Sequence, residues 1–210
     1  MEEQKPPQSG LNRVRTLLWL LVGAAVLALI AVFAVQHSVA PKGSIGLQPA
    51  ESSIGGPFTL TAGDGKPFSS SRLAGKPYAI FFGFTRCGDV CPVTLGRLVK
   101  LRRLAGGDEA FNIVFVTIDP RNDGPKEVGQ YSGLFGAPII GLTGSEAQIG
   151  QVKRQYGIYA EPNPQSSGQG DMMNHTSTVL LFDGNGRLAA TISGNEPDAS
   201  ALQKLKALLG

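Results

Sequence analysis

"YAIFFGFTRCGDVCPVTLGRLVKLRRLA" (Tyr78–Ala105) joins an apolar run to the only two cysteines of the chain and then to a helical pattern. The run over residues 78–85 is nearly continuous and rich in aromatic side chains, which is typical of a strand buried on both faces of a sheet. Leucines then recur at helical spacing, with basic residues around the remainder: Leu95, Leu98, Leu101 and, as the next position, Leu104. The stretch predicts a buried strand, a turn that carries Cys87 and Cys91, and a helix.

Apolar runs alternate with helical patterns over the rest of residues 56–210. Further strands are predicted at 111–119 and 138–143, hairpins around Asp64-Gly65 and around 184–186, and helices over 124–136, 145–158 and 197–209, the first opened by Pro125 and the second capped by Ser145. Residues 161–173 are polar and rich in glycine and proline, and they predict a loop. The order predicts an α/β fold, a central mixed sheet with helices on both faces, and a thioredoxin-like arrangement fits it.

Composition bounds the class of protein. The chain has 210 residues, a formal net charge of +3, and 42% hydrophobic and 17% charged residues, which is a composition that folds. A net charge this small argues against a nucleic-acid partner. We expect one globular domain over residues 56–210 and accessory segments before it.

The N-terminal segment carries a candidate membrane anchor. Residues 16–35 contain no charge, and as a helix they would span about 30 Å, the thickness of a bilayer core. Arg13 and Arg15 precede the run and place the N-terminus on the cytoplasmic side. We therefore predict a cytoplasmic N-terminus (1–15), a transmembrane anchor (16–36) and a tether (37–55), with the domain on the outer side of the cytoplasmic membrane. A cleaved signal peptide is the alternative, but its apolar region would be shorter, and Pro41 would follow the cut.

The cysteine pair has three possible uses: a staple, a redox couple or two metal ligands. Outside the cytoplasm an unprotected pair tends to form a disulfide, yet closing so short a loop removes little entropy from the unfolded chain. A helix N-terminus and the neighbouring Arg86 both favour thiolate, which serves thiol exchange and metal binding alike. If the turn is helical, residues four apart lie about 5–6 Å apart at Cβ, a separation that suits two ligands of one ion.

A third ligand is available in His175, the only histidine outside the tether. It precedes a predicted strand, at the place where thioredoxins carry a cis-proline beside the cysteine loop. Two thiolates and one imidazole suit Cu(I), with Cu(II) also possible, whereas a structural zinc site would need a fourth ligand. Met172 and Met173 are nearby and are interpreted as loop residues rather than ligands.

Three strings, "FFGFTRCGDVCP", "VTIDPRND" and "NHTSTVLLFDGNGRL", behind one apolar N-terminal segment resemble the Sco/SenC family of copper-binding assembly proteins. The resemblance covers roughly residues 55–210. It implies a thioredoxin-like fold, copper bound by Cys87, Cys91 and His175, and a role in building the binuclear copper centre of cytochrome c oxidase subunit II. A copper donor chaperone and a thiol reductant are further partners that it implies. The chain departs from the usual family string at Arg86, Gly88 and Asn174, and none of these changes removes a ligand.

Two questions stay open at the level of sequence. Asp119 and Asp123 follow a buried strand; they could support the ligands from outside the ligand set, but they are interpreted as turn residues and left out of the ligand set. The alternative function is a membrane-anchored thiol–disulfide reductase, in which one of Cys87 and Cys91 attacks a partner's disulfide and the other resolves the mixed disulfide. Turnover of a disulfide substrate without copper, independent of His175, would favour that alternative.

Overall fold

The computed structural model describes residues 9–38, 54–162, 173–175 and 177–210. The chain divides into two compact units, Met1–Glu51 and Ser52–Gly210. The first unit contains helix α1, Ser9–Ser38, in which the predicted anchor falls. Among the described residues, no helix combines the length and the apolar character that crossing a membrane requires.

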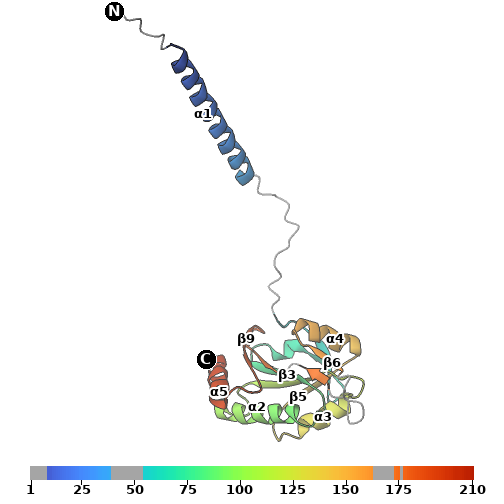
Figure 1. Ribbon diagram of the computed structural model, residues 1–210. Coiled ribbons are helices and arrows are strands. Elements are labelled where there is room, and N and C mark those ends of the chain that lie inside the picture. Colours follow the sequence, from blue (N-terminus) through green and yellow to red (C-terminus); the bar gives the residue numbers. More distant parts are fainter. Residues whose placement is uncertain (1–8, 39–53, 163–172, 176) are drawn as a thin grey trace, which may run out of the picture. The chain divides into compact units, whose positions relative to one another are not determined.

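The second unit is built around a seven-stranded mixed sheet in the order β2-β1-β5-β4-β3-β8-β9 (Figure 1). Its strands are β1 (Thr59–Ala62), β2 (Pro67–Ser69), β3 (Tyr78–Gly83), β4 (Asn112–Thr117), β5 (Ile140–Thr143), β8 (Val179–Phe182) and β9 (Leu188–Ile192). Its helices are α2 (Val90–Gly106), α3 (Pro125–Gly133), α4 (Glu146–Gln155), α5 (Asp198–Leu209) and the 3₁₀ helix η1 (Ser70–Leu73). The predicted mixed sheet is confirmed, and the parallel strands β3, β4 and β5 form its centre.

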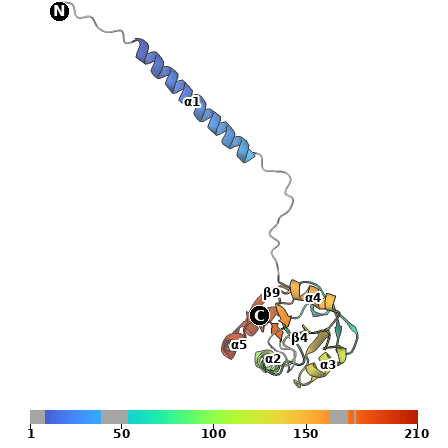
Figure 2. The same cartoon turned by 45° about the vertical axis from the view of Figure 1, so that its right-hand side comes forward.

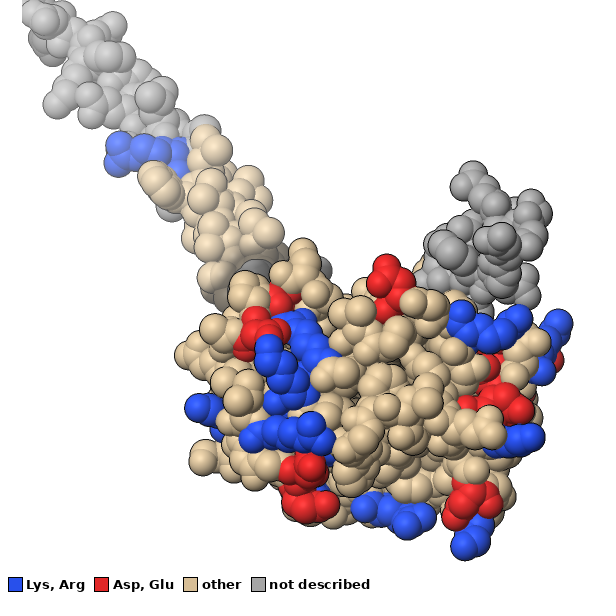
Figure 3. All heavy atoms as spheres, turned by 90° about the horizontal axis from the view of Figure 1, so that it is seen from below, with Lys and Arg blue, Asp and Glu red and all other residues tan. Residues whose placement is uncertain are grey.

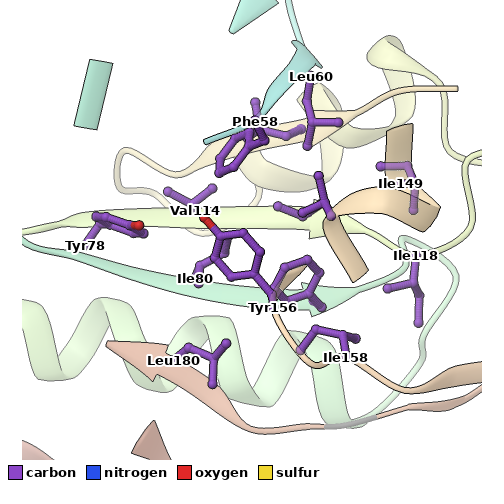
Figure 4. Packing of buried hydrophobic residues seen from close by; sticks show 14 of the residues in the cluster. Phe58, Leu60, Tyr78, Ile80, Val114, Ile118, Ile149, Tyr156, Ile158 and Leu180 are labelled. Carbon is purple, nitrogen blue, oxygen red and sulfur yellow. The ribbon is translucent and has the colours of Figure 1, made fainter. Parts of the chain in front are cut away.

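The central strands are apolar throughout because both of their faces are covered. All six residues of β3 are buried. On one face α2, α3 and α5 pack on alternate strand residues such as Phe81 and Phe115 (Figures 1 and 2). On the other face α4 packs through Ile149, Val152 and Tyr156, and Figure 4 shows the Tyr156 ring among Ile80, Val114 and Leu180. The apolar runs therefore specify the layers as well as the strands.

Turn and cap residues behave as their chemistry predicts. Gly65 has a φ of 79°, the left-handed region that glycine favours, and its N–H donates to the carbonyl of Ala62 across the β1–β2 turn. Ser145 caps α4 in a full capping box with Gln148. Pro125 is the first residue of α3, where its missing N–H removes no helical hydrogen bond. The hairpins and helix starts predicted from these residues are confirmed.

Two details of the predicted helix after the cysteines are wrong. Leu104 is 56% exposed, because the apolar face of α2 continues from Leu101 to Ala105 instead. Arg102, predicted among the surface basic residues, is 1% exposed. Its Nη1 donates to the carbonyl oxygens of Phe111 and Pro138, 3.4 and 2.9 Å away. Those carbonyls are hydrogen-bond partners of the buried guanidinium. Burial lowers the pKa of Arg102 from its ordinary value.

Candidate functional site

Cys87 and Cys91 lie between the end of β3 and the first turn of α2. The helix begins at Val90, so Cys91 is helical while Cys87 sits in the turn before it, where its N–H donates to the Phe84 carbonyl at 3.2 Å. The helical geometry considered from the spacing therefore applies only from Val90 onward. The structure holds both residues as thiols.

The Cys87 sulfur reaches the start of the helix. The N-cap residue Asp89 makes no side-chain capping bond. Instead the Cys91 N–H points to the Cys87 Sγ, with 3.4 Å between nitrogen and sulfur. This N–H is one of those that a helix leaves without an internal partner. A sulfur in this position takes the role of a cap, and a helix N-terminus favours negative charge on it.

The two thiols differ in exposure. Cys87 is partly exposed, whereas Cys91 is 0% exposed. Burial raises the pKa of the Cys91 thiol, and its hydrogen bond with Cys87 adds to that rise. At Cys91 the loss of solvent therefore opposes the effect expected from the helix N-terminus and Arg86. The pair presents one accessible sulfur and one enclosed sulfur.

Gly83, the last residue of β3, makes the room that Cys91 occupies. A Cβ at position 83 would lie 2.7 Å from the Cys91 Sγ and 3.2 Å from a ring carbon of Phe115. Phe115 in turn packs on Tyr131, with 5.2 Å between ring centroids. Among the described residues the Tyr131 hydroxyl has no hydrogen-bond partner, and burial raises its pKa, with smaller contributions from Cys91 and Cys87. Cys91 thus packs against aromatic rings, and only a glycine at position 83 leaves enough space for its sulfur.

The loop after β4 holds the cysteine loop from the side. Asp123 is 0% exposed, and its carboxylate accepts hydrogen bonds from Thr85, two residues before Cys87. Asp119 pairs with Arg86, with 2.8 Å between carboxylate oxygen and Nη2. The turn interpretation is correct, because the N–H of Asp123 donates to the Asp119 carbonyl at 3.0 Å. Both carboxylates also contact the cysteine loop, which agrees with the supporting role that the sequence left as the alternative.

His175 ends strand β7 (Met173–His175), which pairs with β6 (Ala160–Pro162) in a separate two-stranded sheet. Its main chain lies opposite Ala160, and its side chain lies outside the described residues. Because β8 runs antiparallel to β3, the chain enters β8 at the edge of the sheet where β3 ends and the cysteines follow. Among the described side chains, no three His, Cys, Asp or Glu residues gather as metal ligands would, so His175 as third ligand stays a prediction.

The family model described as SCO1/SenC matches residues 47–210, well over half of the chain. The chain belongs to the SCO1/SenC family. A SCO2-like protein of Rickettsia prowazekii is 33% identical over 183 residues, which cover 86% of this chain and 88% of that protein. The mitochondrial protein SCO2 of Saccharomyces cerevisiae is also 33% identical, over 73% of this chain and 52% of its own length.

Solved structures of SCO1/SenC relatives share the fold, which is thioredoxin-like. Bradyrhizobium japonicum ScoI with copper bound is 36% identical with a TM-score of 0.66, and the match covers 74% of this chain and 99% of that one. Yeast Sco1 with copper bound is 29% identical with a TM-score of 0.63, over 73% and 86% of the two chains. These likenesses concern the second unit, which carries the cysteine loop.

The sequence located the thiol pair of this SCO1/SenC chain and offered Asp123 as a possible supporting group, but it did not single out Gly83. Gly83 gave no signal beyond one glycine in a buried strand, a pattern that marks close approach of another group. Asp123 had a clearer signal. It follows β4, and the carboxyl ends of neighbouring parallel strands meet at one edge of the sheet. A carboxylate after β4 is therefore a neighbour of the loop after β3.

Proposed function

We propose that this chain is a copper-binding protein of cytochrome c oxidase assembly that holds copper through Cys87, Cys91 and His175. The observation that carries the proposal is the thiol pair itself, joined by the contact of the Cys91 N–H with the Cys87 sulfur. It stands in a chain whose family relatives have been solved with copper bound. Copper is the cargo in this proposal, received and passed on.

The donor chemistry fits copper. Thiolate and imidazole are soft to intermediate ligands, which suit Cu(I) and also Cu(II). Cys87 is accessible to an incoming ion, and Cys91 lies directly behind it on a floor of aromatic rings. Because burial raises the pKa of Cys91, this thiol gives up its proton when the metal binds, and copper binding should release protons. His175 would complete a site with three ligands.

The partners and the location extend the proposal. The family resemblance supports cytochrome c oxidase subunit II as the recipient, with a copper donor chaperone and a thiol reductant acting before transfer. The uncharged run over residues 16–35 supports an anchor in the cytoplasmic membrane with the domain on its outer side. The relatives solved with copper bound favour metal binding over thiol–disulfide exchange as the main function.

Anaerobic titration of the reduced chain with Cu(I), against a chromogenic chelator of known affinity, tests the ligand set. We expect about one copper per chain. Second-sphere changes at metal sites lower affinity about 10–100-fold, and losing a ligand should cost at least as much in His175→Ala, Cys87→Ser and Cys91→Ser. His37→Ala is the matched control, since His37 is the only other histidine, and it should bind as the parent does. Parent-like affinity in His175→Ala would remove His175 from the site.

A further inference from the structure

We propose that Asp123 is a positioning residue for the cysteine pair, acting through Thr85 to fix the main chain that delivers Cys87 to Cys91. The inference rests on the proposed function in taking Cys87 and Cys91 as the working pair. It concerns residues outside the ligand set. The hydrogen bonds of Asp123 go to threonines, and its influence on the cysteines passes through the loop.

Both carboxylate oxygens of Asp123 are used by threonines. Oδ2 accepts the Thr85 N–H at 2.9 Å and the Thr117 hydroxyl at 2.6 Å. Oδ1 accepts the Thr85 hydroxyl at 2.5 Å. Hydrogen bonds to an ionised acceptor are short and about twice as strong as neutral ones. Thr85 is therefore held at two points, main chain and side chain.

Asp123 is itself fixed to the sheet. The Thr143 hydroxyl, at the end of β5, donates to the Asp123 main-chain oxygen at 2.6 Å. Thr117 ends β4, and Thr85 follows β3 by two residues. Asp123 thus joins the carboxyl ends of three adjacent parallel strands. A shift of Thr85 would break contacts in this buried network and leave buried polar groups unpaired, which is unfavourable.

The rest of the cysteine loop is less constrained. A Cβ at Gly88 would meet nothing within 4 Å, so this part of the loop borders open space. Between Thr85 and the start of α2, the Cys87 N–H donates to the carbonyl of Phe84, which directly precedes the Thr85 that Asp123 holds. Holding two reacting groups in place raises their effective concentration. The hydrogen bonds of Asp123 to Thr85 maintain the contact between the Cys91 N–H and the Cys87 sulfur.

Exchange with glutathione reports that effective concentration directly. The reaction is protein dithiol plus oxidised glutathione giving protein disulfide plus two reduced glutathione molecules. The Cys87–Cys91 bond forms as the glutathione S–S bond breaks, and two electrons and two protons pass to the glutathione sulfurs. Its equilibrium constant rises when the two protein sulfurs are held near each other, and it is measured without copper. A failure here would therefore leave the copper proposal standing.

Thr85→Val removes the side-chain contact with almost no change of shape, and Thr85→Ser keeps the hydroxyl. In the full chain we expect the equilibrium constant to fall about tenfold in Thr85→Val, which is about 30 mV for a two-electron couple, and to stay within about threefold in Thr85→Ser. Asp123→Ala should fall at least as far. Asp123→Asn should stay within about threefold, because its oxygen can accept from the Thr85 N–H and Thr117 while its amide donates to the Thr85 hydroxyl.

Two controls separate positioning from general stability. Asp183→Asn alters a carboxylate that accepts main-chain N–H bonds in the β8–β9 turn, and it should leave the constant unchanged. Urea unfolding of each variant in the reduced state shows how far stability alone has moved. Parent-like constants in both Thr85→Val and Asp123→Ala, with only stability lowered, would overturn the proposal. The proposal would also be overturned if Asp123→Asn lowered the equilibrium constant as much as Asp123→Ala does. The charge of Asp123, and not its hydrogen bonds to Thr85, would then determine the constant.

Discussion

Replacing Gly83 by alanine adds one methyl group where the structure leaves no space for it. The new Cβ would lie 2.7 Å from the Cys91 sulfur, 3.1 Å from a ring carbon of Phe81 and 3.2 Å from one of Phe115. Real Cβ contacts do not approach below 3.0 Å, so the sulfur has to move. The main chain cannot retreat, because β3 is paired with β4 as far as Gly83 opposite Thr117.

The cost follows from these contacts. Overpacking a well-packed core lowers the free energy of unfolding by about 1–3 kcal/mol. For a folded unit of this size, 1 kcal/mol corresponds to about 2–4 °C in melting temperature, so we expect Gly83→Ala to melt about 2–12 °C below the parent. Gly96→Ala is the matched control. Gly96 is an exposed residue within α2 with nothing within 4 Å of the added carbon, and the change should stabilise by about 0.5–1 kcal/mol.

Urea unfolding and thermal melting of the reduced proteins measure both variants. Alkylation with iodoacetamide, followed by mass spectrometry of the two cysteines, reports where the sulfur goes. A displaced Cys91 should react faster relative to Cys87 than it does in the parent. If Gly83→Ala unfolds at the parent's urea concentration and Cys91 reacts at the parent's rate, the close packing of this sulfur on β3 is refuted.

Two other outcomes can be measured on the same material. The Lys204 ammonium and the Ser200 hydroxyl hold the pKa of Glu196 below its ordinary value of 4.5, so the stability that Glu196 contributes is present above pH 4.5 and lost as the pH falls through the lowered pKa. The free energy of unfolding should drop in that acidic range, and less steeply in Glu196→Gln; equal slopes would contradict the assignment. If residues 16–36 anchor the chain, alkaline carbonate should leave the full chain in the membrane pellet and release a chain that starts at residue 54, whereas release of both would contradict the anchor.

The fold could be predicted because its signals are local. The apolar run of β3, the Asp64-Gly65 turn and the Ser145 cap each depend on residues within one element, and each is confirmed. Helices on both faces followed from the same runs, since strands without polar alternation need cover on both sides.

Short elements escaped prediction. β6 and β7 have three residues each and pair with each other at the ends of the predicted loop. Three residues are too few for a period of two to appear, and Ala160–Pro162 has no β-branched or aromatic residue. Such strands form because they find a partner across the loop, and the sequence of one of them does not contain that information.

The cysteine pair was predictable from the sequence, whereas the contacts that position it were not. Two cysteines in one loop are visible in the sequence, whereas the exposure of one and the burial of the other depend on β3 and α2 packing together. The bond from Thr85 to Asp123 joins residues 38 apart in the chain. Arg102 shows the same limit, because its burial depends on the carbonyls of Phe111 and Pro138 and on the nearby carboxylate of Asp108.

Two carboxylates of one loop reach the cysteine loop, and burial distinguishes their effects. Arg86 is 41% exposed where it pairs with Asp119, and an ion pair open to water contributes about 0–1 kcal/mol. Asp123 is fully buried and accepts three hydrogen bonds, each of which contributes about 1.5–3 kcal/mol when one partner is charged. The Arg86–Asp119 pair, in which Asp119 is 12% exposed, also holds the loop, but its contribution is the smaller of the two. We therefore expect the position of Cys87 to depend more on the contacts between Thr85 and Asp123 than on the arginine.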